Sequence, residues 1–313
     1  MNQLCRNFAR EFPQARTPAG AGLSLIVCYY LLTTGMKIDA HQHFWLHTPE
    51  EFGWITDDMA AIRRNFLPHD LLPELQEAGI DGCVAVQAAQ SPDENHFLLG
   101  LAEEYGFIRG VVGWVDLQAG DVSDTLADLV SAYPKLAGVR HVVQSEPDPD
   151  FLLRPAFMNG IRQLEKHRLT YDILIRHPQL PAAVQFAGKL PNQPFVLDHL
   201  AKPDIKTGAG FGIWKDTISQ LAAHPNVCAK LSGMVTEADW QHWQPGDFGR
   251  YLDAMLEAFT PHRLMFGSDW PVCLVASPYQ QTVSLVTDYI ARLTENERAM
   301  VMGGNAQAFY RLR

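Results

Sequence analysis

The sequence has little positive charge and no cluster of it. It contains 25 lysines and arginines against 35 aspartates and glutamates, which gives a formal net charge of −10. Binding to nucleic-acid phosphates requires clustered cations, so the composition argues against a nucleic-acid partner. The negative charge does not define a substrate, because a negative surface mainly favours solubility.

Cysteine is scarce and shows no pairing pattern. The five cysteines are odd in number, and no two have the Cys-x-x-Cys spacing. Cys83 and Cys228 lie in apolar, strand-like runs, where a thiol behaves as a small hydrophobic group. A reduced, intracellular setting accounts for this most simply, so the expected location is the cytoplasm.

A membrane-spanning run is also missing. The apolar segment Leu23–Leu32 is too short to cross a bilayer as a helix. Arginines precede it, as in a secretory signal peptide, but Glu11 stands among them and no clean small-residue cleavage site precedes Met36. We therefore interpret residues 1–35 as an N-terminal extension outside the core, with Met36 as the expected true start. Residues 36–313 are predicted to form one domain without membrane association.

After Met36, short β-branched runs alternate with longer helical patterns, which is typical of βαβ units and a parallel sheet. Eight such units predict a closed (β/α)8 barrel. The sequence has no glycine-rich phosphate loop after the first strand, which argues against a dinucleotide-binding fold. The predicted strands cover residues 37–40, 82–87, 108–115, 136–143, 170–175, 195–198, 227–231 and 264–267. The predicted helices cover residues 69–78, 93–105, 122–133, 155–167, 180–189, 213–224, 248–259 and 278–293, and a final helix over 306–311 should pack against the barrel.

Metal-type residues gather at the ends of these strands, where barrel enzymes keep their catalytic groups. His41 and His43 follow the first strand, His199 the sixth and Asp269 the eighth. Residues i and i+2 of an extended chain point to the same side, so the first two histidines can meet one ion. Imidazole and carboxylate ligands suit zinc in catalytic sites, and an aspartate beside a metal can take the proton of a bound water. The set predicts a metal-type hydrolase.

Other polar residues at strand ends are candidates for substrate binding. Arg140 and His141 end the fourth strand, and only one of them should face the barrel interior because strand neighbours point opposite ways. An inward arginine is costly to bury without a partner, which favours a function for Arg140, whereas His141 is as compatible with a structural hydrogen bond. Lys202 either contacts substrate or is solvated, and Asp198 would anchor a loop or an imidazole. Lys230 and Ser232 end the seventh strand without an assigned role.

Tryptophans in the loops near the predicted mouth are a further set of candidates. Trp45, Trp54 and Trp270 could stack on a sugar-like ring, although core packing is the default for tryptophan. The connection Phe44–Pro68 is longer than usual connections, which favours a functional role. We interpret it as a lid over the site.

Five segments resemble the amidohydrolase superfamily, within it the amidohydrolase 2 branch. They are MKIDAHQHFW, GVRH, VLDHLAKP, GSDWPV and GGNAQAFYRL, and the resemblance covers nearly the whole chain from Met36. They look closest to sugar-lactone hydrolases of the L-fuconolactonase and L-rhamnonolactonase kind. The resemblance implies a distorted (β/α)8 barrel that opens a sugar-acid lactone to the aldonic acid. It also places His41, His43, His199 and Asp269 at the family's site positions, with Asp269 activating the water.

The same resemblance limits the metal. Binuclear members bridge their ions with a carboxylated lysine on the fourth strand, where this chain offers Arg140 and His141. One divalent ion at most, zinc by preference, is therefore expected, and a reaction with or without it stays open. His177 is an additional candidate ligand, because mononuclear members often take a histidine from the fifth strand. In the expected mechanism a metal or Arg140 polarises the lactone carbonyl, and His199 holds the water or stabilises the oxyanion.

Three other functions remain open. A metal-dependent decarboxylase of the same superfamily would require His177 as a metal ligand. A hydrolase of a dicarboxylate lactone would require inward-facing arginines in addition to Arg140. A barrel that only binds a sugar acid has no need for aligned histidines and an aspartate. A small-molecule lactone is the expected partner, and a homodimer is kept open.

Overall fold

A computed structural model describes residues 35–312, so the predicted extension lies, apart from Gly35, outside the described residues. Among the described residues no helix is both long enough and apolar enough to cross a membrane.

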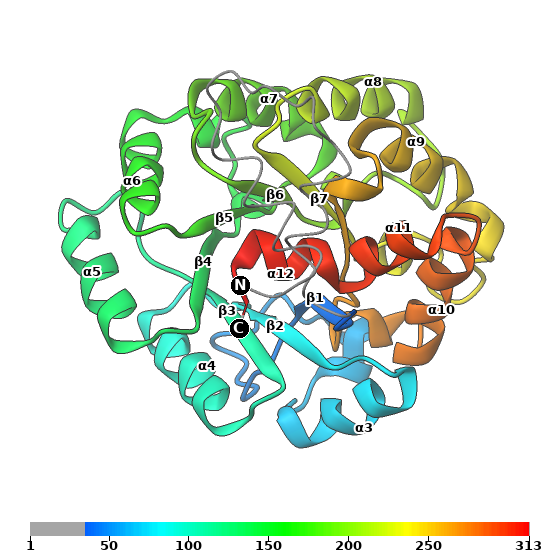
Figure 1. Cartoon of the computed structure of the whole chain (residues 1–313), viewed down its shortest axis with the longest axis horizontal. Coiled ribbons are helices and arrows are strands. Elements are labelled where there is room, and N and C mark those ends of the chain that lie inside the picture. The colour runs from blue at the N-terminus through cyan, green and yellow to red at the C-terminus, as the bar shows by residue number, and fades with distance from the viewer. Residues whose placement is uncertain (1–34, 313) are drawn as a thin grey trace, which may run out of the picture. The chain divides into compact units, whose positions relative to one another are not determined.

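Eight parallel strands form one sheet whose spatial order follows the sequence from β1 to β8. Between β8 and β1 the ring is completed by two backbone hydrogen bonds, from the Asp269 amide to the His41 carbonyl (2.8 Å) and from the His43 amide to the Trp270 carbonyl (2.7 Å). The predicted (β/α)8 barrel is thus confirmed, and Figure 1 shows its helices arranged around the strands. The strands are β1 Ile38–Gln42, β2 Gly82–Val86, β3 Ile108–Gly113, β4 Leu136–His141, β5 Thr170–Ile173, β6 Phe195–Leu197, β7 Val227–Leu231 and β8 Leu264–Phe266.

The helices of the outer layer lie where the sequence predicts them, with ends shifted by at most three residues. Several begin with proline in the first turn, where its missing N–H costs nothing. Their apolar faces pack on outward residues such as Val111, Val139 and Leu197 to form the main core. The helices are α3 Pro68–Ala78, α4 Pro92–Glu104, α5 Val122–Ala132, α6 Pro155–Lys166, α7 Leu180–Lys189, α8 Phe211–Ala222, α9 Gly249–Phe259 and α10 Tyr279–Ile290.

Strand β1 carries an irregularity that matters for the site. Asp39 pairs with Cys83 and Gln42 with Ala85, so β1 uses one residue more than β2 over this stretch, which is a β-bulge. Ala40 therefore packs in the barrel interior, and the next residue, His41, also reaches inward to Lys230. The bulge lets Ala40 and His41 both face the interior, and β1 ends at Gln42, two residues beyond the predicted end.

The amino-terminal end of the barrel is closed by the end of the chain. Helix α12, Asn305–Tyr310, crosses the barrel opening in Figure 1, as expected for the final helix. It follows a short helix that the sequence did not predict, α11 Glu295–Ala299. Tyr310 inserts into the inner cluster with Ile38 and Val84. The active site is therefore expected at the opposite, carboxyl-terminal end of the strands, where the active sites of barrel enzymes form.

Candidate active site

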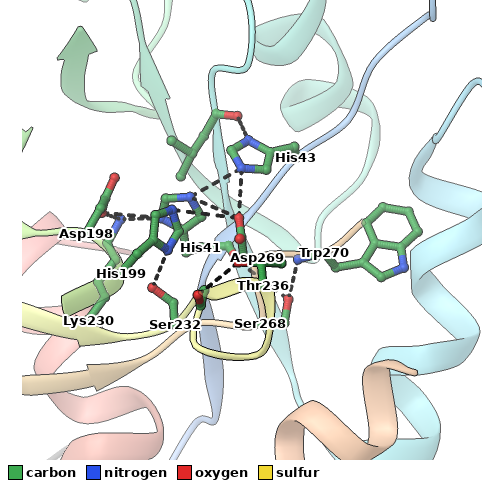
Figure 2. A network of polar contacts seen from close by, with 12 residues as sticks. His41, His43, Asp198, His199, Lys230, Ser232, Thr236, Ser268, Asp269 and Trp270 are labelled. Atoms are coloured by element: carbon green, nitrogen blue, oxygen red, sulfur yellow. Dashed lines mark hydrogen bonds and ion pairs between the residues drawn. The ribbon is translucent and has the colours of Figure 1, made fainter. Parts of the chain in front are cut away.

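Three histidines converge on one carboxylate at the carboxyl ends of the strands (Figure 2). The Nε2 atoms of His41 and His43 are 3.2 Å apart. Asp269 Oδ1 lies 3.3 Å from Nε2 of His43 and 3.8 Å from those of His41 and His199. The structure therefore brings together the four residues that the sequence proposed as one set, and all four are buried.

Two glycines make room for these rings. A side-chain carbon on Gly267, directly after β8, would lie 2.7 Å from Cβ of His41. Gly233, after β7, has φ +61° and lies so close to the His199 ring that any side chain would overlap it. Glycine is required at both positions because the backbone must pass against an imidazole.

Asp39 fixes the start of the loop that carries Asp269. Its carboxylate accepts hydrogen bonds from the Ser268 backbone amide (2.9 Å) and hydroxyl (2.6 Å) and from the Tyr279 hydroxyl (3.1 Å). Burial raises the pKa of Asp39 to about 6, against the opposing effect of these hydrogen bonds. The first aspartate of the DAHQH segment is thus an anchor between β1, β8 and α10.

The second nitrogen of each histidine is held by a partner outside the cluster. Nδ1 of His43 donates to the Val86 carbonyl at 2.7 Å, and Nδ1 of His199 lies 2.9 Å from the Ser232 hydroxyl. Nδ1 of His41 lies 3.3 Å from Asp198 Oδ1, as expected if Asp198 anchors an imidazole. The Val86 carbonyl can only accept, so it fixes the proton of neutral His43 on Nδ1 and leaves its Nε2 unprotonated.

Burial sets the charges of the site. It lowers the pKa of His41, of His43 and, to about 4, of His199, so all three are neutral near pH 7. Burial alone would raise the pKa of Asp269, but the neighbouring imidazoles, first His199 and then His43 and His41, outweigh it and hold that pKa below its usual range. Neutral imidazoles and an ionised carboxylate therefore face one another.

This donor set fits one divalent ion. Two groups of potential ligands share His41: one adds His43 and Asp269, the other Asp198 and His199, and the atoms of each lie within 4.8 Å of one another. A tetrahedral zinc with ligands at about 2.0–2.1 Å separates neighbouring ligand atoms by roughly 3.3 Å, close to the spacing in the first group.

The second group is already neutralised by cations of the chain. Lys230 Nζ lies 3.0 Å from both His41 Nδ1 and Asp198 Oδ1, and 2.5 Å from Asp172. Arg140 Nη1 lies 3.1 Å from Asp198 Oδ2. An ion beside Asp198 would meet two like charges, so the geometry favours a single ion at the first group.

Arg140 and His141 point to opposite sides of β4. Arg140 faces the interior, where it donates to Asp198 and to the Gln87 carbonyl and reaches His41 Nε2 at 3.2 Å. His141 stacks on Phe151 with ring centroids 5.0 Å apart and pairs with Glu146 at 2.8 Å. Only Arg140 thus borders the histidine cluster.

The three tryptophans proposed for substrate contact lie in different surroundings. Trp45 is 1% exposed, and its indole donates to the Arg64 carbonyl. Trp270 is 2% exposed and packs edge-on against Phe66. Trp54, 42% exposed, lies on the long first loop. The first two are wall residues beside the cluster, and Trp54 alone presents a large surface to solvent.

The remaining two candidates lie just beyond β5 and β6. Lys202 Nζ is 3.5 Å from Glu237, which links the loops after β6 and β7. His177 places Nδ1 3.1 Å from the Lys202 carbonyl, and it belongs to neither potential ligand group among the described residues.

Sequence reasoning missed the partners beneath the cluster. Asp172 binds Lys230 from one side and accepts from the Tyr310 hydroxyl at 2.7 Å, which ties the last helix to the site. The available signal was a charged residue inside an apolar strand, Asp172 in TYDI and Lys230 in VCAKL. An inward charge in such a run requires a buried partner.

The eight-stranded barrel and the cluster of histidines and aspartate at its carboxyl end are the features of an amidohydrolase-type enzyme, the type that the sequence resembles. The model of the amidohydrolase family matches residues 38–312; the chain belongs to this family. It is 38% identical over 287 residues to an L-fucono-1,5-lactonase of Burkholderia multivorans, covering 88% of this chain and 96% of the relative. It is 37% identical over 284 residues to an L-fucono-1,5-lactonase of Burkholderia ambifaria, covering 88% and 96%.

A solved structure agrees with both fold and family. A crystal structure of an amidohydrolase from Burkholderia multivorans with bound zinc has a TM-score of 0.85 and 39% sequence identity, covering 89% of this chain and 100% of the other. The family is typically dependent on divalent metals, which is consistent with the potential ligand groups found here.

Proposed function

We propose that this protein hydrolyses the lactone of a sugar acid, of the L-fuconolactone or L-rhamnonolactone kind, to the aldonic acid. The observation that carries the proposal is the ionised, buried carboxylate of Asp269 facing the Nε2 atoms of three neutral imidazoles, those of His41, His43 and His199. Similarity to two lactonases over most of the chain supports the choice of substrate. Residues 36–313 act as one catalytic domain in this proposal, and the free, buried Cys83 and Cys273 support a cytoplasmic location.

Asp269 serves as the general base. Its carboxylate takes a proton from a water that attacks the lactone carbonyl carbon, and the carbonyl oxygen becomes an oxyanion. His199, whose ring is held by Ser232, orients this water or donates to the oxyanion. Collapse of the intermediate breaks the bond to the ring oxygen, and the proton on Asp269 passes to that oxygen. The product is the open hydroxy acid.

His41, His43 and Asp269 would hold the single metal ion, with His199 at its edge. When bound, such an ion polarises a carbonyl or lowers the pKa of a water. We propose zinc, because two imidazoles and a carboxylate suit it. Arg140, engaged by Asp198 and Gln87, keeps positive charge at the border of the cluster.

The test is a pH-indicator assay of the purified protein against a panel of aldonolactones, with and without chelator. We expect acid release from at least one L-configured lactone. Release from none would overturn the lactonase proposal, and release that resists the chelator would remove the metal from the mechanism. Asp269→Asn should lower kcat by at least about 10³-fold, within the span of general-base catalysis, with an unchanged circular dichroism spectrum; near-normal hydrolysis would refute the role of Asp269.

The decarboxylase alternative depends on His177. Its ring contacts the Lys202 carbonyl and stands apart from the ligand atoms around Asp269, which favours the lactonase. A lactone of a dicarboxylic acid is less well matched, because the inward Arg140 is already bound to Asp198.

A further inference from the structure

A cleft opens at the carboxyl-terminal end of the barrel, between the long first loop and the loops after β6 and β7. Its volume is about 650 Å³. Asp58, in the short 3₁₀ helix Asp57–Ile62 of the first loop, lines one side. Lys206 follows β6, and Thr236, Glu237, Asp239 and Trp240 follow β7. The cleft therefore lies along the seam where the first loop meets the body of the barrel.

The loop after β7 connects this cleft directly to His199. Ser232 contacts the His199 ring, and Gly233 lies against the same ring. The Thr236 hydroxyl donates to the Gly233 carbonyl at 2.9 Å, which ties Thr236 to the glycine that lies against the His199 ring. The wall of the cleft therefore begins three residues after the glycine that contacts His199, on the same loop.

The lining has the chemistry of a sugar site. Trp240 is the largest aromatic side chain among the lining residues, and it is half-buried. Its indole N–H donates to the Thr236 carbonyl at 2.9 Å, which fixes the ring and leaves its face for contact. Sugar rings stack their C–H faces on such aromatic surfaces, and their hydroxyls donate to carboxylates.

Charged groups around the ring are held in place by one another. Glu237 pairs with Lys202 at 3.5 Å, and Asp239 pairs with Lys206 at 3.5 Å. Each carboxylate retains acceptor capacity beyond these contacts. Charges fixed by neighbours lose little freedom when a ligand binds, which favours affinity.

We propose that this cleft is the subsite for the hydroxylated part of the sugar lactone, with Trp240 as its stacking surface and Glu237 and Asp239 as acceptors for its hydroxyls. The proposal rests on the lactonase function proposed above. In this proposal the loop after β7 selects the substrate. Trp240 is the residue that stacks on the sugar ring, and Trp45 and Trp270 are structural residues of the wall.

The experiment compares Trp240→Ala, Trp240→Phe and the wild type on two lactones of equal ring size, L-fucono-1,5-lactone and unsubstituted δ-valerolactone. We expect Trp240→Ala to raise KM for the hydroxylated lactone about five- to tenfold, with kcat within about twofold, as loss of one stacking surface implies. KM for δ-valerolactone should stay within about twofold, and Trp240→Phe should resemble the wild type on both. A control is Tyr133→Ala, which removes a half-buried aromatic from a different cavity between α4 and α5 and should leave both KM values unchanged.

An unchanged KM in Trp240→Ala, or an equal rise for both lactones, would overturn the subsite. Glu237→Gln is an independent variant should Trp240→Ala fold poorly; it should raise KM for the hydroxylated lactone alone, by about tenfold.

Calorimetric titration of L-fuconate into Asp269→Asn separates this proposal from the function itself. If the wild type hydrolyses neither lactone but the added Trp240→Ala change still weakens L-fuconate binding five- to tenfold, the lactonase proposal fails and the sugar-acid subsite stands. If hydrolysis is present and L-fuconate binding is indifferent to Trp240, the subsite fails and the lactonase stands.

Discussion

Lys230 Nζ lies 3.0 Å from Asp198 Oδ1, with both side chains fully buried beneath His41. The same ammonium contacts Asp172 at 2.5 Å. One lysine thus contacts two carboxylates inside the barrel, with Arg140 as the second cation at Asp198, and it touches the first histidine of the cluster. The packing of the barrel interior and the orientation of the site therefore depend on the same group.

Lys230→Met should destabilise the protein strongly. Removal of one partner of a buried ion pair leaves an uncompensated charge, at a cost of about 3–5 kcal/mol. Urea denaturation followed by circular dichroism measures this. The matched control is Lys215→Met, since Lys215 pairs with Glu257 on the surface, and exposed pairs contribute about 1 kcal/mol or less. Equal effects of the two substitutions would contradict the buried network.

The number of metal ions bound per chain tests whether Lys230 and Arg140 keep a second ion out of the site. With Lys230 and Arg140 occupying the surroundings of Asp198, the purified protein equilibrated with zinc should hold about one ion per chain. His43→Ala should hold substantially less, because it loses one of the three ligands in the first group. Elemental analysis after gel filtration gives the ratio. Two ions per wild-type chain would show that the cations do not block the second group.

The overall barrel could be predicted because the alternation of short apolar runs with helical patterns repeats eight times. The pairing of His41 with His43 followed from the period of an extended chain, and their meeting with His199 and Asp269 followed from the shared end of the strands. The division of Arg140 and His141 between the two faces of β4 followed from the same alternation.

Other features depend on tertiary contacts that no local pattern encodes. The bulge at Ala40 and His41 is set by the register of β1 against β2. Asp172 and Lys230 become partners only when β5 and β7 are arranged around one axis. Trp45 and Trp270 are wall residues because Phe66 packs against both. Trp240 lies in the predicted connection after the seventh strand, but no local pattern indicates which side chains of that connection line a cleft.

Glu94 should make stability depend on pH. Burial raises the pKa of this carboxyl to about 7 from 4.5, even though the Ala88 and Ala89 amides donate to it. The folded protein therefore holds this proton more tightly than the unfolded chain, so stability falls as pH rises from about 4.5 to about 7 and is then constant with respect to this group. The shift corresponds to an upper limit on the order of 3 kcal/mol.

Glu94→Gln removes that titration while keeping an acceptor for the two amides. Relative to the wild type, the variant should gain up to about 2–3 kcal/mol of unfolding free energy between pH 5 and pH 8, measured by urea denaturation at each pH. Parallel pH profiles of the two proteins would mean that Glu94 titrates normally.

The turn after β6 holds His199 in an unfavourable backbone conformation. His199, Leu200, Ala201 and Lys202 all have φ between 50° and 58°, a left-handed region that costs non-glycine residues roughly 1–2 kcal/mol each. The turn is held by the Trp214 indole, which donates to the Leu200 carbonyl at 2.8 Å, and by His177 at the Lys202 carbonyl. We infer that this strain is maintained because it directs the His199 ring at Asp269.

Ala201→Gly should separate stability from activity. Glycine relieves the strain at φ 58° but loses a buried methyl and gains freedom in the unfolded chain, so the unfolding free energy should change by less than about 1 kcal/mol. The turn becomes freer to move, and kcat should fall severalfold while KM changes little, because His199 acts in the proposed transition state. The control is Thr260→Gly, at an exposed residue with φ 56° between α9 and β8, which should stabilise the protein slightly and leave kcat unchanged. Equal kcat in Ala201→Gly and the wild type would show that the strained turn does not position His199.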